Sequence, residues 1–401
     1  MGRVAYGSSG LLALALLTAC SAGPAQNPEG VAMAGGARAA AVAVSPPDKA
    51  ANVPTDQAVV VSAQGGTLKS VRVEGGKSGA LNGVLSADGT RWRSTTTARP
   101  STSYTVTAVA VNPAGKQSET TSTFATVKGT KTFDIQTITP NKDDTGLTVG
   151  VGMPVLIAFD KPVTDRVAVE RNLSIHSSKP VEGAWHWFDN SHVDFRPRRY
   201  WPPRTKVQVE ARLAGVRGGP GLYGKRDVKL DFKIGRSQIT KGSLNEHVLY
   251  VRRDGKKIRE MPMSAGQGGV WKYHTTSGIH VAMSREPSTL MTSPGIGPGQ
   301  SGYYSLMVYN TVRISNSGEY VHSAPWSVGS QGNSNVSHGC VNISPDNAAW
   351  FIKNTLIGDP IILTGGPRKL EPTNGWGHWQ ENWKQWLKWS VLKDGPTMML
   401  S

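Results

Sequence analysis

The chain has 401 residues, of which 38% are hydrophobic and 18% charged, and it contains 46 Gly and 25 Pro. This length exceeds what one hydrophobic core usually organises, so two to four domains are expected, and the Gly and Pro content favours turn-rich β structure over helical bundles. The net charge of +16 favours attraction to anionic polymers or lipid headgroups, although it also serves solubility. The sequence has no interleaved aromatic and basic motif of the RNA-binding kind, so no nucleic-acid partner is expected.

Residues 1–20 have the pattern of an export signal. An early arginine precedes a nine-residue, mostly apolar run at residues 11–19, and no acidic residue occurs before Glu29. Such a run is too short to cross a bilayer, which takes about 20 apolar residues, but it fits a signal peptide. Leu17-Thr18-Ala19-Cys20 resembles a bacterial lipobox, which implies that Cys20 is lipidated and anchors the protein at the outer face of the cytoplasmic membrane. A cleaved signal with an incidental cysteine is the alternative.

The next two segments differ sharply in pattern. Residues 21–45 are rich in Ala and Gly and lack a core-forming pattern, which predicts a flexible tether. From 46 to 127, short β-type runs alternate with turn signals. Tyr104, Val106 and Ala108 fall on one face of the longest run, as does Ala110. About seven short strands in a segment of this length predict an immunoglobulin-like sandwich.

A second unit of the same kind is predicted from 128 to 241. It contains β-type runs such as PVLIAFDKPV and DVKLDFKIG, and 20 Lys and Arg against 12 Asp and Glu, so half of the net charge lies here. Its densest basic cluster comprises Arg196, Arg198, Arg199 and Arg204. This cluster either contacts an anionic glycan polymer or forms a solvated edge, and the solvated edge is favoured.

A third unit is predicted from 242 to 366, and it opens with two β-type runs around Asp254-Gly255, a strong hairpin signal. The same unit contains SHGCVN at residues 337–342, with one of the two cysteines of the chain. If Cys20 carries lipid, Cys340 has no partner for an internal disulfide, and a lone exported thiol calls for a chemical reason. A structural zinc site is not indicated, because it needs about four ligands at recurring spacings. Ordinary strand or surface positions are predicted for His176, His186 and His192.

A nucleophilic cysteine needs a general base that yields the thiolate, and the base needs an acceptor that holds its tautomer. His322 and His338 are the histidines nearest to Cys340 in the sequence. If SHGCVN is extended, His338, Cys340 and Asn342 point to one side, which favours His338 as the base. Spacing alone does not choose between the two histidines.

The pattern H-S-x13-S-H-G-C-V-N, which runs from His322 to Asn342, resembles the signature of L,D-transpeptidase catalytic domains of the YkuD type. The stretch VHSAPWSVGSQGNSNVSHGCVNISPDNAAWF is similar to mycobacterial and actinobacterial lipoprotein enzymes that cross-link peptidoglycan, and VGVGMPVLIAFDKPV resembles their preceding immunoglobulin-like domain. The resemblance covers residues 46–401. It implies a mainly β fold, with two immunoglobulin-like β-sandwich domains followed by a β-rich YkuD-type catalytic domain and a C-terminal helical brace.

This resemblance implies that Cys340 is the acylated nucleophile and that His322, rather than His338, is its general base. It further implies that Ser323 orients His322 through its main-chain carbonyl. His338 stays among the implied catalytic residues because, with Gly339, it would shape the substrate and oxyanion region. Main-chain N–H groups around Gly339 and Cys340 are the natural oxyanion donors, since preorganised dipoles best meet developing charge.

Substrate-binding positions follow from the same resemblance. Tyr304, eighteen residues before His322, matches the lid tyrosine of the family, with Tyr303 as the alternative. The chain departs from the family at Thr275-Thr276-Ser277-Gly278, where a Thr-Pro-x-Gly segment is usual, and in the lid at residues 284–306. The residues implied for the oxyanion and substrate region are Gly339, Tyr304, Asn342, Ser337 and Trp326.

The activity implied is that of a peptidoglycan L,D-transpeptidase, a cysteine acyltransferase that joins tetrapeptide stems by 3→3 cross-links and releases terminal D-Ala. Donor and acceptor stems would be its partners, carbapenem β-lactams its covalent inhibitors, and no metal or organic cofactor is required. An L,D-carboxypeptidase or related cysteine hydrolase would use the same residues with water as acceptor. A sortase-like transferase would normally add an arginine downstream of the cysteine, and the next one is Arg368. A purely envelope-binding protein would not need Cys340.

The C-terminal extension, residues 367–401, is rich in tryptophan. Trp379, Trp383 and Trp386 recur at i, i+4 and i+7, which predicts one stripe of an amphipathic helix. A membrane-surface or glycan-binding helix is one interpretation. Spacing and the family resemblance favour a helix docked on the catalytic domain as a brace.

Overall fold

The computed structural model describes residues 38–143, 146–293, 295–301, 303–393 and 398–399. The predicted signal peptide with Cys20, and residues 21–37 of the predicted tether, lie outside the described residues. Strands dominate the described part, which confirms the mainly β class, and its buried apolar side chains form three clusters. No helix in this described part is long and apolar enough to span a membrane.

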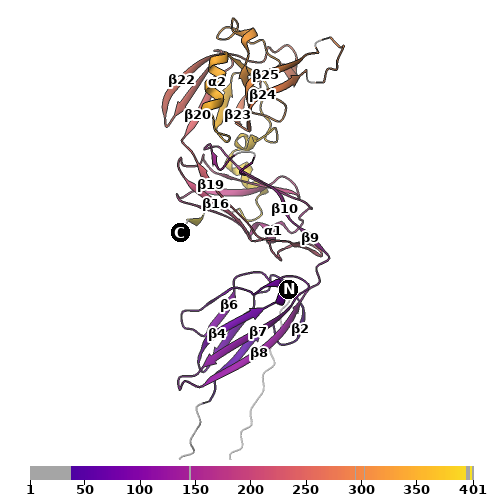
Figure 1. Ribbon diagram of the computed structural model, residues 1–401, viewed down its shortest axis with the longest axis vertical. Helices are drawn as coiled ribbons and strands as arrows, with labels where there is room; N and C mark the ends of the chain where they lie inside the picture. The colour runs from indigo at the N-terminus through magenta and orange to yellow at the C-terminus, as the bar shows by residue number, and fades with distance from the viewer. Residues whose placement is uncertain (1–37, 144–145, 294, 302, 394–397, 400–401) are drawn as a thin grey trace, which may run out of the picture. The chain divides into compact units, whose positions relative to one another are not determined.

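The first cluster lies between two four-stranded sheets, with the strand orders β1-β3-β6-β5 and β2-β8-β7-β4 (Figure 1). The period-two prediction for β7 is confirmed, because Tyr104, Val106, Ala108 and Ala110 are fully buried. The first strand begins at Ala41, so the predicted tether extends too far at its C-terminal end. The elements are β1 (Ala41–Ser45), β2 (Ala50–Val53), β3 (Val60–Gln64), β4 (Thr67–Glu74), η1 (Gly76–Ser78), β5 (Gly83–Leu85), β6 (Arg91–Ser94), β7 (Ser103–Val111) and β8 (Gln117–Thr126).

The second cluster is the core of a similar sandwich. Its two main sheets have the orders β10-β12-β15-β14 and β11-β19-β16-β13-β29. The same segment of the chain also forms a small sheet with the order β17-β18-β9. The elements are β9 (Lys131–Phe133), β10 (Ile135–Thr139), β11 (Thr148–Val149), β12 (Val155–Phe159), α1 (Arg166–Glu170), β13 (Leu173–Ser177), β14 (Gly183–Trp187), β15 (His192–Pro197), β16 (Lys206–Ala211), β17 (Arg217–Gly219), β18 (Leu222–Gly224), β19 (Val228–Ile234) and β29 (Met398–Met399).

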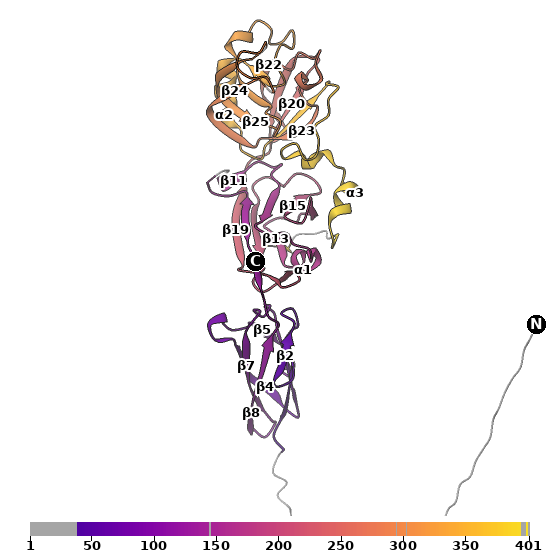
Figure 2. The same cartoon turned by 90° about the vertical axis from the view of Figure 1, so that its right-hand side faces the viewer.

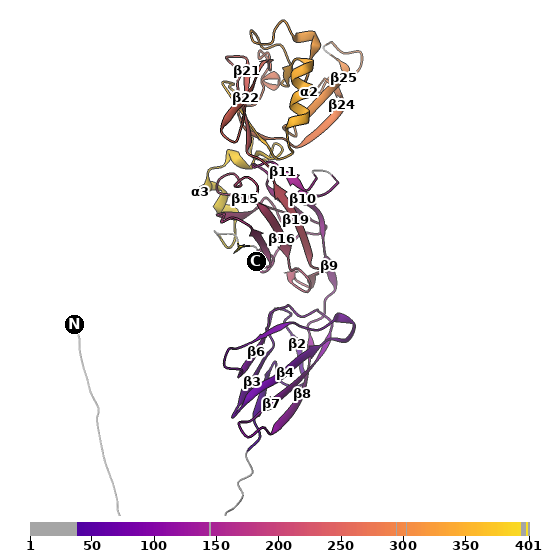
Figure 3. The same cartoon turned by 60° about the vertical axis from the view of Figure 1, so that its left-hand side comes forward.

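The third cluster is enclosed by one strongly bent sheet, with the order β23-β28-β20-β21-β22-β27-β26-β25-β24. Helix α2 packs against β25 and β26 (Figure 3), and its own side chains Ala348 and Phe351 are buried. The predicted hairpin is present at Asp254 and Gly255, which both have positive φ angles. The elements are β20 (Gln238–Ser243), β21 (Val248–Arg253), β22 (Lys256–Ser264), η2 (Trp271–Tyr273), β23 (Gly278–Val281), β24 (Ser284–Thr292), β25 (Ser305–Arg313), β26 (Tyr320–Ser323), η3 (Pro325–Ser327), β27 (Val341–Ile343), α2 (Pro345–Asn354) and β28 (Pro360–Thr364).

The C-terminal extension forms short helices, η4 (Gly377–Gln380), α3 (Trp383–Trp386) and η5 (Leu387–Trp389), so the prediction of one continuous helix is wrong. Glu381 has an extended backbone, and the Asn382 side chain accepts from the Gln385 N–H and begins a new helix. The expected docking on the catalytic unit is present, and the extension also contacts the second sandwich. Trp386 Nε1 donates to Ala184 O of β14 at 2.9 Å, and α3 lies beside this sandwich in Figure 2. Gln380 contacts β23 of the third unit through Ile279 O.

Arg196 differs from the other residues of the predicted basic cluster because its side chain is buried. Arg198, Arg199 and Arg204 are exposed as expected, but Arg196 is buried because the C-terminal extension covers its strand. Its guanidinium lies over three indole rings, 4.7 to 5.4 Å from their centroids, and donates to Glu381 O. Burial lowers the pKa of Arg196 to about 10. We call this contact the tryptophan joint; it comprises Arg196, His186, Asp194, Trp379, Trp383, Trp386 and His378.

Two histidines of the tryptophan joint are held by hydrogen bonds. His186 Nδ1 lies 3.1 Å from Trp386 O, and its ring stacks on the Trp386 indole with centroids 4.2 Å apart. His378 Nε2 lies 2.7 Å from Asp194 Oδ2. Burial lowers the pKa of His186 to about 4, and burial raises the pKa of Asp194 although His378 opposes this shift. His186 is therefore the strand histidine that the sequence predicted, but a buried one.

Candidate active site

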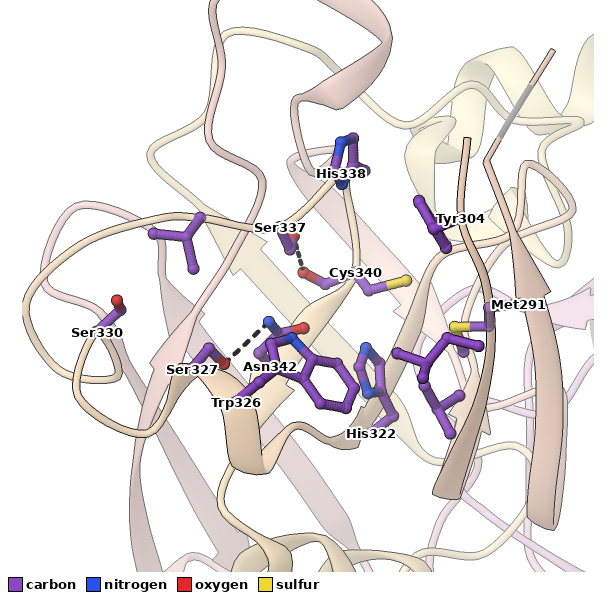
Figure 4. A pocket seen from close by; sticks show the side chains of 13 residues that line it. Met291, Tyr304, His322, Trp326, Ser327, Ser330, Ser337, His338, Cys340 and Asn342 are labelled. Carbon is purple, nitrogen blue, oxygen red and sulfur yellow. Dashed lines mark hydrogen bonds between the residues drawn. The ribbon is translucent and has the colours of Figure 1, made fainter. Parts of the chain in front are cut away.

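Two parallel strands bring the predicted catalytic residues together. In the pairing of β26 with β27, His322 lies opposite Asn342, and Cys340 immediately precedes β27. Parallel pairing aligns the two neighbouring strands in the same direction, so residues eighteen apart in the sequence come close together within the sheet. Figure 4 shows Cys340 between His322 on one side and His338 on the other. The assumption that SHGCVN is extended throughout is wrong, since the chain bends at Gly339 before the strand begins.

The turn that presents Cys340 is fixed by short polar contacts. Gly339 has φ of +126°, a conformation that L side chains rarely adopt, and a Cβ there would meet nothing closer than 4.0 Å. Glycine is therefore required for the backbone angle rather than for space. Ser337 Oγ donates to Cys340 O at 2.6 Å and accepts from the Gly339 N–H at 3.1 Å. Thr275 Oγ1 donates to Gly339 O at 2.8 Å.

His322 is held in one tautomer. Its Nδ1 lies 2.9 Å from Ser323 O, and because a carbonyl only accepts, Nδ1 carries the hydrogen of the neutral ring. Nε2 is then the basic nitrogen. Burial lowers the pKa of His322, while the bond to Ser323 O opposes this shift, so the imidazole is neutral near pH 7. The Trp326 ring lies 6.0 Å from the His322 ring and is more than half exposed.

The thiol is protonated in the resting structure. Cys340 Sγ lies 3.6 Å from Gly318 O. Burial raises the pKa of Cys340 to about 12, the Tyr320 N–H lowers it by bonding to the sulfur, and the charge of Glu319 raises it. A thiol with such a pKa holds almost no thiolate at pH 7, so its reaction depends on a base that removes the proton as the sulfur attacks.

A cavity of about 380 Å³ lies in front of these groups, and we call it the His322-side cavity. Tyr304, rather than Tyr303, lines it. Ser323 contributes its carbonyl from behind the cavity, and Gly339 lines a second cavity described below. The sequence-predicted residues that line the His322-side cavity are Tyr304, His322, Trp326, Ser337, His338, Cys340 and Asn342.

The remaining predicted residues have structural partners. The His338 ring packs edge-on against Tyr273, with centroids 4.5 Å apart, and lies 5.4 Å from the Tyr304 ring. Asn342 Nδ2 donates to Ser327 Oγ at 3.1 Å, which ties β27 to the loop after β26. His338 is thus placed against aromatic rings, whereas His322 has the tautomer of a base.

A buried polar cluster under the site was missed from the sequence. Glu319 is 4% exposed, and its carboxylate accepts from the Thr276 N–H at 2.7 Å and from Thr276 Oγ1 at 2.8 Å. Thr276 Oγ1 also lies 2.8 Å from His280 Nε2. Thr276 lies in the segment where the family resemblance led us to expect Thr-Pro-x-Gly, and its N–H, which a proline would lack, donates to Glu319. No local pattern identifies Glu319 as the partner of Thr276, because the two residues are 43 positions apart in the sequence.

Metal chemistry was not indicated by the sequence. Among the residues that the structure describes, no group of three or more His, Cys, Asp or Glu side chains could hold a metal ion.

Comparison with known protein families matches two regions of the chain. Residues 239–363 match the L,D-transpeptidase catalytic domain, and residues 50–217 match a bacterial Ig domain. The first match begins in β20 and ends in β28, so it contains nearly all of the nine-stranded sheet, with Cys340 and His322. The second begins at β2 of the first sandwich and ends at β17 of the second, so it covers parts of both units.

Two curated proteins of Mycobacterium tuberculosis are similar over most of the chain. L,D-transpeptidase 5 is 35% identical over 353 residues, which covers 86% of this chain and 76% of that protein. L,D-transpeptidase 2 is 35% identical over 350 residues, which covers 84% of this chain and 82% of that protein. A solved structure of LD transpeptidase LdtMt1 in complex with imipenem is 39% identical, covers 58% of this chain and 99% of that chain, and superposes with a TM-score of 0.49.

Proposed function

The chain belongs to the L,D-transpeptidase family, and we propose that it forms 3→3 cross-links between peptidoglycan stem peptides through a thioester on Cys340. The observation that carries this proposal is the pairing of β26 with β27. Through this pairing, His322, neutral and in a defined tautomer, and Cys340 line the same cavity. A protonated thiol beside a neutral imidazole is the resting state that nucleophilic acyl transfer requires.

In the first half of the reaction, Sγ turns from Gly318 O toward His322, whose Nε2 accepts the thiol proton. The sulfur attacks the carbonyl between the third residue of a tetrapeptide stem and terminal D-Ala, and a tetrahedral oxyanion forms. Gly339 N–H already donates to Ser337 Oγ, so we assign the Cys340 N–H as the leading oxyanion donor. The carbon–nitrogen bond then breaks, His322 returns the proton to the leaving amine, and D-Ala departs from the thioester.

In the second half, the side-chain amine of another stem attacks the thioester carbonyl. His322 takes a proton from that amine, the carbon–sulfur bond breaks, and the thiolate leaves. The thiolate is then reprotonated by His322, which restores the resting thiol. The high pKa that burial gives Cys340 favours this return to the neutral thiol.

Incubation of the purified protein with a disaccharide tetrapeptide tests this function. Mass spectrometry should find a dimer that has lost one D-Ala, and Cys340→Ala should abolish it. Ser337→Ala is the useful partner variant, because it leaves the thiol and loosens the turn, so it should lower the rate without abolishing it. A disaccharide tripeptide as the main product would favour the carboxypeptidase, and no turnover with the wild-type protein would contradict both.

Carbapenems should inhibit by the same chemistry. Attack of Sγ on the strained β-lactam carbonyl opens the ring, and the released nitrogen takes the proton, so a thioester adduct remains on Cys340. Imipenem is the probe, and digestion with mass spectrometry should place its full mass on the Cys340 peptide. An adduct on any other peptide would contradict the assignment of the nucleophile.

We also propose that Cys20, outside the described residues, carries the lipid that holds the protein at the outer face of the cytoplasmic membrane. The support is the lipobox-like sequence before it. A Cys20→Ser variant should move the protein from the membrane fraction to the soluble fraction of the envelope, and unchanged fractionation would contradict the anchor.

A further inference from the structure

A second cavity of about 450 Å³ also opens onto Cys340, and we call it the Gly318-side cavity. It shares Met291, Tyr304, His338 and Cys340 with the His322-side cavity. The two differ in charge. The side chains that line the His322-side cavity include neither Lys, Arg, Asp nor Glu, whereas Lys272, Glu319 and Arg368 line the Gly318-side cavity.

Arg368 is fixed in the wall of this cavity. Its carbonyl accepts from the Ser277 N–H at 2.7 Å, and the next residue, Lys369, forms a parallel bridge with Ser277. The Arg368 side chain is only 16% exposed. Its nearest carboxylate oxygen is 3.9 Å away on Glu371, a side chain that is 54% exposed. A guanidinium held near the surface by so long a contact keeps its capacity to bind another anion.

Two further charged side chains line the cavity with Arg368. Lys272 adds a second positive charge, with its Nζ 5.3 Å from the centre of the Tyr273 ring. Glu319 is the acidic residue of the cavity, but its carboxylate oxygens accept from Thr276. The side chains that line the Gly318-side cavity thus carry two positive charges and one negative charge, while Glu371, the partner of Arg368 at 3.9 Å, lies outside this lining.

We propose that the Gly318-side cavity binds a carboxylate of the peptide substrate and that Arg368 is its anchor. The proposal rests on the proposed function, in which both stems are peptides that carry free carboxylates. A planar guanidinium matches a carboxylate with two parallel hydrogen bonds. The neutral His322-side cavity offers no such partner. The carboxylate belongs either to the donor, as on the leaving D-Ala, or to the acceptor stem, and the two sources are separated by experiment.

The first experiment needs no transpeptidase activity. Iodoacetate and iodoacetamide both alkylate the thiol with loss of iodide and a proton, but only iodoacetate carries a carboxylate. Their rates at Cys340 are measured in the full chain by mass spectrometry of the Cys340 peptide. Arg368→Gln should lower the iodoacetate to iodoacetamide rate ratio about threefold. Lys369→Gln, which removes the exposed neighbouring cation, should leave the ratio unchanged, and Arg368→Lys should largely preserve it.

The iodoacetamide rate is an internal control, because a misfolded variant would change it as well. If Arg368→Gln does not fold, the ratio in the wild-type protein decides, since it should fall as salt is raised from 0.01 to about 0.5 M. If the rate ratio changes neither in Arg368→Gln nor with salt concentration, the proposal is overturned.

The second experiment identifies the source of the carboxylate. Donor and acceptor stems are each compared as the free acid and as the C-terminal amide. Arg368→Gln should raise KM about tenfold or more for one acid substrate and not for its amide. Equal effects on acid and amide overturn the carboxylate subsite. Absence of turnover in the wild-type protein contradicts the proposed function instead, while the alkylation ratio still decides whether the cavity binds an anion.

Discussion

Histidines in two regions of this protein are buried to the same extent but have different surroundings. His322 in the active site, and His186 and His378 in the tryptophan joint, are each 3% exposed. The joint surrounds its imidazoles with indole rings and holds them by hydrogen bonds. His378 also lines a cavity, of about 490 Å³, but His322 lines a cavity that Cys340 lines as well. Burial alone therefore does not distinguish the two environments, whereas a cavity shared with a cysteine thiol does.

The comparison predicts that substitutions of the two kinds of histidine change different measured properties, with the largest effect at His322. In His322→Ala, the rate of Cys340 acylation by imipenem should fall about 10²- to 10⁴-fold, because the thiol would lose the general base that we propose for it. Thermal unfolding should change little. His378→Ala is the matched control, since it removes an equally buried imidazole from the joint and should leave acylation intact. An equal loss of acylation rate in both variants would contradict the distinction between His322 and the joint histidines.

The second prediction concerns the joint itself. Trp386 is fully buried, stacks on His186 and donates to Ala184 O. Trp386→Ala should therefore lower the free energy of unfolding by about 3–5 kcal/mol, the usual cost of truncating a buried tryptophan. Denaturant titration followed by fluorescence measures it. Trp389→Ala, at a position 57% exposed, should cost less than about 1 kcal/mol. A small loss at Trp386 would mean that the joint does not hold the extension.

The two regions also differ in how far the sequence predicted them. Period-two burial in β7 and the hairpin at Asp254 follow from local pattern. The resemblance to the family motif singled out His322 and Cys340 as candidate catalytic residues. The burial of Arg196 could not be predicted, because the rings that cover it come from residues about 190 positions later. The place of Arg368 in the Gly318-side cavity and the Thr276 contact to Glu319 were missed for the same reason, since local periodicity carries no information on which distant segments meet.

A third prediction tests whether the catalytic unit has a buried polar cluster comparable to the joint. In Thr276→Val the N–H donor to Glu319 remains, but the hydroxyl donor to the carboxylate is lost. A weakened hydrogen bond to a buried charge costs about 2 kcal/mol of unfolding free energy. The double variant Thr276→Val with Glu319→Leu removes both partners and should recover part of this loss. If the two single losses simply add, the residues are not coupled.

The smallest effect is the pH dependence, where the same physical cause should appear in two readouts. Burial lowers the pKa of His186 to about 4 from an ordinary 6.5. As the pH falls below 6.5, the unfolded imidazole binds a proton and the folded one does not, so stability is lost between about pH 6.5 and 4. The ceiling is about 3 kcal/mol, and with solvent screening we expect about 1–2 kcal/mol.

The raised pKa values of Asp194 and Glu381 act in the opposite direction, because the folded carboxyls bind protons at a higher pH than the unfolded ones. The difference in unfolding free energy between the wild-type protein and His186→Phe, measured at pH 7 and pH 4.5, isolates the histidine. His322, whose pKa burial also lowers, should show its titration in acylation instead, with a rate that falls on acidification only below pH 6.5. If His186→Phe removed the acid limb of acylation, the joint and the active site would be one coupled unit rather than two.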